Sequence, residues 1–191
     1  MDTDRRADRV PHIPQVHDDE IRDPALAAVI EEAATTKAPP PSWYRTLGHN
    51  APVAVAFAQY WELLHRGGQV EHRIKELCRL QIAQLIDCEF CARQASPAAG
   101  ITGEEKASCA VPDWEHPDPR TAAALHYSRT LVLGEGDDEV YEELHRHFTD
   151  AEIVEIAAFA MLTMGGNRMA KSWRLDASAP SGEPEAAEQH A

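Results

Sequence analysis

Glu76-Leu-Cys-Arg-Leu-Gln-Ile-Ala-Gln-Leu-Ile-Asp-Cys88-Glu-Phe-Cys91 lies in the middle of this 191-residue chain. Apolar residues cover most of the circumference of a helix predicted over residues 70–86, so we expect this helix to be deeply buried. A Cys-x-x-Cys pair follows directly, and Glu76 precedes its first cysteine by twelve residues. The stretch therefore predicts a helical scaffold that carries a redox-active dithiol with an acid/base helper.

The two cysteines of the pair are placed for thiol chemistry. Residues three apart share one face of a helix, close enough for a disulfide or for a shared metal ion. Asp87 is a favourable N-cap residue, and as a cap it would put Cys88 in the first helical turn. Free backbone N–H groups and the helix dipole favour a thiolate there. Cys91 would lie one turn further in, placed to resolve a mixed disulfide.

Glu76 can act on this pair only if the chain bends. In one straight helix, Glu76 and Cys88 would be roughly 18 Å apart along the axis. We therefore expect a break near Ile86–Asp87 that folds the second helix back toward Glu76. The alternative is that Glu76 is a solvated helix carboxylate paired with Arg79 or Arg73.

The Cys-x-x-Cys pair has two further interpretations, which are a pair of buried thiols and one half of a zinc site. A zinc site needs two more ligands, and these would have to come from His72 or His126. Cys78 and Cys109 have no partner at ligand spacing, and Cys78 fits a small core residue. We expect neither a metal nor another cofactor in this protein.

One family shares this arrangement of residues. The order Arg73-x-x-Glu76-Leu, an apolar helix, Cys88-x-x-Cys91 and then Ala-Gly-Ile-Thr-x-Glu-Glu resembles the alkylhydroperoxidase-D-like branch of the carboxymuconolactone decarboxylase family. The likeness runs from about residue 41 to residue 175, and the glutamate-to-cysteine spacing is its specific part. The resemblance implies the alkylhydroperoxidase-D-like helical fold and association as trimers or hexamers. It also implies that Glu76 is a proton-relay glutamate and that Cys88 and Cys91 are redox cysteines.

This chain departs from the family pattern at one position. The family motif has a histidine four residues after the second cysteine, and here that position is Ala95. By resemblance, the histidine would help to deprotonate the attacking thiol. His126, in a mid-chain helix, is a candidate to replace it, and a purely structural histidine is the alternative. The nucleophile stays open, because helix-terminus physics favours Cys88 and the family relay favours Cys91.

Composition excludes several classes of function. The net charge of −14 argues against binding to nucleic acid or to an anionic membrane. No apolar segment typical of a secretory signal begins the chain, and the longest apolar run, Ile156–Met164, is too short to span a bilayer. Four cysteines in a chain of this length do not indicate a disulfide scaffold. These features predict a cytoplasmic protein whose paired cysteines are catalytic rather than structural.

Helix signals divide the chain into segments. We expect an all-α, single-domain bundle of about eight helices around two buried ones, spanning residues 23–175. Residues 1–22 read as a flexible N-terminal arm and residues 176–191 as a disordered acidic tail. The clearest helix starts are Asp23-Pro24, Thr102-x-x-Glu105, Asp118-Pro119 and Thr149-x-x-Glu152.

The function predicted from these residues is that of a thiol-dependent oxidoreductase of peroxidase type, resembling a peroxiredoxin in its chemistry. Cys88 and Cys91 would reduce a peroxide or a disulfide, Glu76 would move or stabilise the proton, and a protein dithiol would regenerate the enzyme. The chain would form a homo-oligomer. One alternative is a non-redox decarboxylase or lactone-processing enzyme, in which a histidine, Glu76 and Arg73 do acid/base work. Another is an oligomeric binding protein without turnover.

Overall fold

The computed structural model describes residues 10–111 and 114–175, and within these ranges all regular secondary structure is helical. Short 3-10 turns at Asp18–Glu20, Gly48–Asn50 and Pro97–Ala99 interrupt the connections between the α-helices. The predicted all-α bundle is confirmed, with nine α-helices in the described ranges where about eight were expected. They are α1 (Pro24–Thr36), α2 (Pro41–Leu47), α3 (Ala51–His65), α4 (His72–Leu85), α5 (Glu89–Arg93), α6 (Gly103–Ser108), α7 (Pro119–Leu133), α8 (Asp138–His147) and α9 (Asp150–Trp173).

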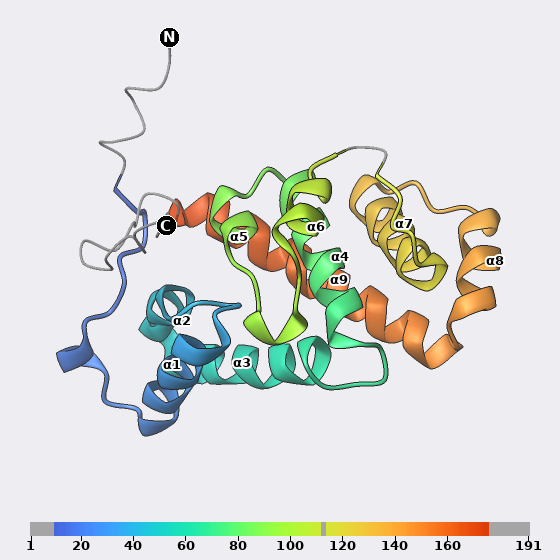
Figure 1. Ribbon diagram of the computed structural model, residues 1–191. Coiled ribbons are helices and arrows are strands. Elements are labelled where there is room, and N and C mark those ends of the chain that lie inside the picture. Colours follow the sequence, from blue (N-terminus) through green and yellow to red (C-terminus); the bar gives the residue numbers. More distant parts are fainter. Residues whose placement is uncertain (1–9, 112–113, 176–191) are drawn as a thin grey trace, which may run out of the picture.

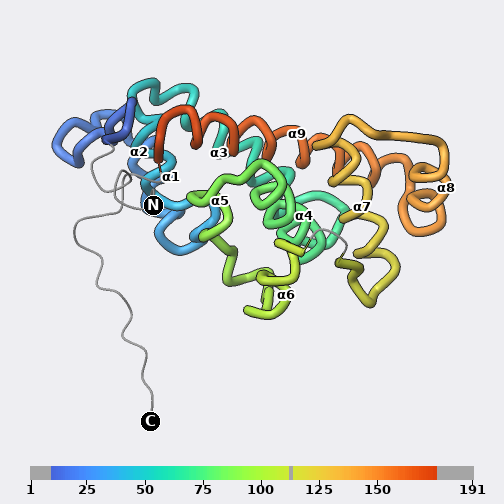
Figure 2. The backbone as a smooth tube through the Cα atoms, turned by 90° about the horizontal axis from the view of Figure 1, so that it is seen from above, coloured from blue at the N-terminus to red at the C-terminus, as the bar shows by residue number. Residues whose placement is uncertain are grey.

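The long helices α4 and α9 organise the bundle. Figure 1 shows them in the middle of the molecule, with α1, α2 and α3 at one end and α7 and α8 at the other. α4 packs against both α7 and α9. Seen from above, α9 runs along the molecule from α8 to the region of α2 (Figure 2). Both ends of the bundle are therefore tied to the same central pair.

Side-chain caps begin the helices where the sequence predicts. The Asp23 carboxylate accepts hydrogen bonds from two backbone N–H groups of α1, and the Asp118 carboxylate accepts one from the Thr121 N–H of α7. Thr102 and Thr149 each form a reciprocal capping box at the start of α6 and α9. Each cap satisfies N–H groups that have no partner inside the helix, so these boundaries follow from local chemistry.

Buried apolar residues form two main clusters, one on each side of α4. The first joins α4 to α7, α8 and the first half of α9, and the second joins α1, α2 and α5 to the end of α9. Leu77 and Leu80 of α4 belong to the first cluster, whereas Cys88 and Cys91 belong to the second. The dithiol therefore sits in apolar packing near the middle of the molecule.

A buried ion pair sets the turn between α3 and α4. Lys75, which is 1% exposed, donates to the Glu155 carboxylate at 2.7 Å. Glu155 also accepts from the backbone N–H groups of Gln69 and Val70, at 2.7 and 3.3 Å. Gly68 adopts φ +84°, and a Cβ there would lie 2.3 Å from Glu155 Oε1. A glycine is needed at this turn both for its backbone conformation and for space.

The chain before α1 packs against the body of the protein. His12 N donates to Trp173 O at 3.0 Å, and Val16 N donates to Arg45 O at 3.1 Å. Residues 1–9 of the predicted arm and the whole predicted tail, 176–191, lie outside the described residues. Among the described helices, none combines the length and the apolar character that crossing a bilayer requires.

One face of α9 is apolar and exposed. Val154 and Met161 are 67% and 58% exposed in the single chain. The described residues bury the other face of α9, and association into a homo-oligomer stays a prediction.

Leu77→Ala tests the central position of α4. Leu77 is fully buried at 0% exposure, so truncation should leave a cavity and lower the free energy of unfolding by about 2–5 kcal/mol. Urea unfolding followed by circular dichroism measures this loss. Leu133→Ala is the matched control, because Leu133 is 45% exposed and should cost well under half as much. Equal losses in the two variants would contradict a core built on α4.

Candidate active site

The helical stretch breaks just before the first cysteine of the pair. α4 ends at Leu85, Asp87 adopts a left-handed conformation with φ +55°, and α5 starts at Glu89. The backbone N–H of Cys88 donates to Ala83 O, which closes the turn. The predicted break is therefore present, and it turns the Cys-x-x-Cys segment back along α4.

Asp87 is not the N-cap of the second helix, so that prediction is wrong. Its left-handed backbone makes it the end of the turn, a conformation that aspartate tolerates better than most residues. Its carboxylate faces Lys171 Nζ at 3.3 Å. The cap shifts by one residue to Cys88, whose Sγ accepts a hydrogen bond from the Cys91 N–H at 3.4 Å.

Cys88 and Cys91 are joined by a disulfide, with their Cα atoms 5.3 Å apart. That separation lies in the middle of the range that disulfides adopt. Both residues are buried, at 2% and 8% exposure. The two side chains are therefore placed to bond each other inside the protein.

Glu76 lies beneath this pair at the centre of a buried hydrogen-bond network. It is 0% exposed, so the solvated-carboxylate interpretation is wrong. Its Oε2 is 2.8 Å from both His65 Nε2 and Arg79 Nε, and its Oε1 accepts from Arg79 Nη2 at 2.9 Å. Oε1 also accepts from the backbone N–H of Ser96 at 2.8 Å. All four hydrogen bonds donate toward the carboxylate, so they stabilise its charged form.

Arg79 connects Glu76 to the dithiol segment. Its guanidinium donates to Cys91 O at 2.9 Å and to Gln94 O at 2.5 Å, beyond the bonds to Glu76. These carbonyls belong to the last turn and the C-cap of α5, where a cation suits the helix dipole. Glu76 therefore reaches the cysteines through Arg79 and through the backbone of the loop.

His65, at the end of α3, is a site residue that no sequence motif indicated. Its Nδ1 is 3.1 Å from Trp61 Nε1, and an indole nitrogen can only donate. Nδ1 must therefore accept, and the ring proton lies on Nε2 and is donated to Glu76. The available signal was the helical spacing of Phe57, Trp61 and His65, which places the three on one face of α3.

The electrostatics of this network keep the carboxylate ionised and the imidazole neutral. Burial alone would raise the pKa of Glu76, but the charge of Arg79 and the hydrogen bonds from His65 and Arg79 outweigh it. The pKa of Glu76 is therefore well below its ordinary value. Burial lowers the pKa of His65, although the bond to Glu76 opposes this shift. The Trp61 N–H also favours neutral His65, because a second ring proton, on Nδ1, would point directly at that N–H.

His72 lies beside His65 rather than beside the cysteines. The two rings are 4.5 Å apart and meet edge to face, and ligand atoms of His65, His72 and Glu76 lie within 4.8 Å of one another. A cation there would face the Arg79 guanidinium and would have to displace the His65 proton. The donors already fill the Glu76 oxygens, so these residues fit a hydrogen-bond network better than a metal site.

Other candidates from the sequence lie elsewhere. His126 is exposed on α7 and lines a separate surface depression with Arg129 and Glu143. Arg73 bonds Glu105 and the carbonyls that precede α6, so it does not share a site with Glu76. The family histidine position, Ala95, lies in the extended segment after α5. Of the acid/base group of a histidine, Glu76 and Arg73 that the alternative function requires, a histidine and Glu76 meet, as His65 and Glu76, whereas Arg73 lies elsewhere.

Two further cysteines are structural. Cys78 and Cys109 are buried at 1% and 4% exposure, and burial raises the pKa of each thiol to about 12. A thiol with so high a pKa stays protonated and is a poor nucleophile. The prediction that Cys78 is a small core residue is confirmed.

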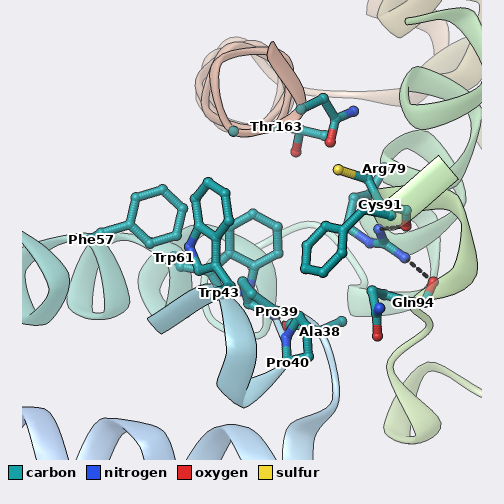
Figure 3. A pocket seen from close by; sticks show the side chains of 13 residues that line it. Ala38, Pro39, Pro40, Trp43, Phe57, Trp61, Arg79, Cys91, Gln94 and Thr163 are labelled. Atoms are coloured by element: carbon teal, nitrogen blue, oxygen red, sulfur yellow. Dashed lines mark hydrogen bonds between the residues drawn. The ribbon is translucent and has the colours of Figure 1, made fainter. Parts of the chain in front are cut away.

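A small cavity of about 40 Å³ lies against Cys91. Figure 3 shows the Cys91 sulfur pointing into it, toward Thr163 of α9 and opposite the rings of Trp43, Phe57 and Trp61. Cys88 instead lines a depression on the other side with Asp87, Glu89, Arg93 and Lys106, among others. The two buried cysteines therefore border different surfaces, one mostly aromatic and the other polar.

The lowered pKa of His72 leads to a prediction about stability. Burial lowers the pKa of His72 to about 4, from an ordinary 6.5. Between these pH values the unfolded chain binds a proton that the folded protein does not, so stability should fall as the pH is lowered. His72→Phe should reduce this slope in urea titrations, leaving the part due to His65. His126→Phe, at an exposed histidine, should leave the slope unchanged, and equal slopes in all three proteins would refute the assignment.

Comparison with known proteins finds solved structures that have a similar fold. No protein-family model matches the chain, and no curated protein sequence matches it either. Several solved structures do. A peroxidase-related protein from Ralstonia eutropha JMP134, described as an alkylhydroperoxidase AhpD core, matches with a TM-score of 0.67 and 21% identity, over 86% of this chain and 90% of its own.

Two further structures cover a similar share. A peroxidase-related protein from Silicibacter sp. TM1040 has a TM-score of 0.68 and 19% identity, over 87% of this chain and 93% of its own. The debrominase Bmp8 has a TM-score of 0.71 and 16% identity, over 85% of this chain and 90% of its own. The chain therefore has the alkylhydroperoxidase-D-like fold that its Glu76–Cys88–Cys91 spacing predicted.

Proposed function

We propose that this protein is a thiol-dependent oxidoreductase of peroxidase type, with Cys91 as the attacking thiol and Cys88 as the resolving one. The observation that carries the proposal is that the two cysteines border different surfaces. Cys91 lines a small, mostly apolar cavity that can hold a small substrate, whereas Cys88 borders a polar depression. This difference favours Cys91 in the choice that the sequence left open.

The proposed reaction has three steps. The Cys91 thiolate attacks the terminal oxygen of a hydroperoxide, so an S–O bond forms, the O–O bond breaks and the alkoxide takes up a proton. The Cys88 thiol then displaces water from the Cys91 sulfenic acid, giving the disulfide. A protein dithiol finally reduces this disulfide by exchange and becomes a disulfide itself. Two electrons pass from the donor to the peroxide in each cycle.

Glu76 is proposed to act as a positioning residue in this cycle. Its pKa is low, and its oxygens accept four hydrogen bonds. Glu76 is therefore a poor proton carrier near neutral pH. Its charge instead holds Arg79 in the apolar interior, and Arg79 holds the carbonyls of Cys91 and Gln94. The network thereby fixes where the Cys91 sulfur points. This role replaces the proton movement that the family resemblance implied.

The environment of Cys88 fits exchange with another protein. Arg93 and Lys106 bring positive charge to the rim of its depression, and Asp87 and Glu89 bring negative charge. Arg93 and Glu89 are exposed, so a partner's side chains can reach them. An attacking thiolate from a donor dithiol would approach Cys88 from this depression. Such a cycle requires a reducing compartment, in keeping with the predicted cytoplasmic setting.

Variants of the two cysteines test the proposal. Cys91→Ser should lower peroxide consumption, measured with dithiothreitol as donor, by a factor on the order of 10³ or more, because the nucleophile is lost. Cys88→Ser should react once and accumulate Cys91 sulfenic acid, which dimedone traps for mass spectrometry. Cys109→Ala is the matched control and should keep wild-type turnover. Equal turnover in all these proteins would remove the dithiol from the reaction.

A second candidate is reductive dehalogenation of a small aromatic compound. The aromatic wall beside Cys91 favours a flat ligand, and the structural neighbour Bmp8 is a debrominase with a structure in complex with 2,3,4-tribromopyrrole. The chemistry uses the same dithiol: an aryl bromide and two thiols give the arene, bromide, a proton and the disulfide.

Bromide release separates the two candidates. If the protein is a peroxidase, the reduced wild-type enzyme should consume peroxide rapidly and release bromide from a bromopyrrole no faster than Cys91→Ser. Rapid bromide release by wild type, with slow peroxide consumption, would favour dehalogenation. Both assays use the same reduced protein, so a difference between them reflects the substrate.

A further inference from the structure

Three buried polar side chains around Cys91 have an atom without a hydrogen-bond partner in the protein. They are the indole nitrogen of Trp43, the hydroxyl of Thr163 and the amide nitrogen of Asn167. The three residues are 3%, 2% and 4% exposed, and all line the Cys91 cavity. An unpaired buried donor costs roughly 1–3 kcal/mol, so a cluster of three calls for an explanation.

Two helices bring these groups to one cavity. Thr163 and Asn167 are four residues apart on α9 and so lie on the same side of that helix. Trp43 comes from α2, and its ring lies 3.8 Å from where a Cβ on Gly166 would be. A Cβ at that distance would make an ordinary van der Waals contact, so the Trp43 ring lies directly beside α9. The cluster is therefore a consequence of how α2 packs on α9.

The rest of the cavity wall has a different character. Pro39, Pro40, Phe57, Trp61 and Phe90 supply apolar surface, and the charged lining residue is Arg79. Neither an aspartate nor a glutamate lines the cavity. The indole and amide nitrogens can only donate, and the hydroxyl can donate or accept. The cavity therefore suits an uncharged molecule that has a small apolar part and an oxygen able to accept hydrogen bonds.

We propose that Trp43, Thr163 and Asn167 form a substrate subsite that holds the leaving oxygen of a small alkyl hydroperoxide during attack by Cys91. This inference rests on the proposed peroxidase function. As the S–O bond forms and the O–O bond breaks, negative charge develops on the alkoxide oxygen. The fixed donors stabilise that charge before the alkoxide takes a proton and leaves as the alcohol. The apolar wall contacts the alkyl group.

The size of the cavity limits the substrate. A volume of about 40 Å³ holds a two-oxygen group and little more, so a larger alkyl part must extend toward the opening. The apolar residues at the opening can contact that alkyl part, and hydrogen peroxide makes no such contact, so we expect tert-butyl hydroperoxide to react faster than hydrogen peroxide. A bulky aromatic hydroperoxide should react more slowly than either.

The test measures the second-order rate at which reduced Cys91 reacts with tert-butyl hydroperoxide in Thr163→Val and Asn167→Leu. Iodoacetamide alkylation of the same thiol is the internal reference, because its leaving iodide makes little demand on hydrogen-bond donors. The ratio of the two rates should fall roughly 10-fold in Thr163→Val. It should fall roughly 100-fold in Asn167→Leu, where a donor to the leaving oxygen is lost.

A change in shape or folding would alter both rates and leave their ratio intact. Ser128→Ala is the matched control, since Ser128 carries a buried hydroxyl on α7 away from the cavity. Its ratio should equal that of the wild type. If Asn167→Leu does not fold, Asn167→Asp keeps the size of the side chain and removes the N–H donors, so the same fall in the ratio is expected.

Two results would overturn the subsite, and they are distinguishable. If Cys91→Ser abolishes turnover but the ratio is unchanged in both subsite variants, the groups bind only water and the peroxidase function stands. If reduced wild-type protein reacts with no peroxide while iodoacetamide still labels Cys91, the peroxidase function fails and the subsite with it.

Discussion

The buried pair of Glu76 and Arg79 is the interaction on which the site depends. Removing two charges from water costs several kcal/mol for each ion, and their attraction offsets this only when the remaining hydrogen-bonding capacity is satisfied. Here that capacity is filled by His65, by the N–H of Ser96 and by the carbonyls of Cys91 and Gln94. Because the pair is stable only with these partners, it ties α3, α4 and the segment after α5 together.

The consequence is a disulfide with two different sides. Arg79 donates a hydrogen bond to the backbone carbonyl of Cys91. The left-handed turn at Asp87 determines the direction in which the segment with both cysteines leaves α4. In this orientation Cys91 faces the aromatic cavity and Cys88 faces the polar depression. A redox cycle needs access for two unlike partners, a small oxidant and a large reductant. The two cysteines border different surfaces of the loop, which offers each partner its own side of the disulfide.

The two histidines near Glu76, His65 and His72, belong to the buried network around the carboxylate and not to the cavity beside Cys91. His65 is held neutral by burial and by the Trp61 N–H, and it donates its one ring proton to the carboxylate. His72 lies against it with a lowered pKa. Neither residue lines the Cys91 cavity. His65 supports the charged state of Glu76 through its hydrogen bond, and His72 packs edge to face against His65.

Local chemistry was enough to predict the helical class, most helix starts and the break before Cys88, because caps, apolar spacing and the Cys-x-x-Cys pair act over a few residues. The identity of the cap next to the cysteines was mispredicted, since the left-handed backbone of Asp87 arises from the closure of the turn. His65, Thr163 and Asn167 carry no motif, and His65 lies about a hundred residues before the other two. They meet Cys91 and Glu76 only because α3 and α9 pack against α4, and contacts between such distant segments depend on the shape of the whole core.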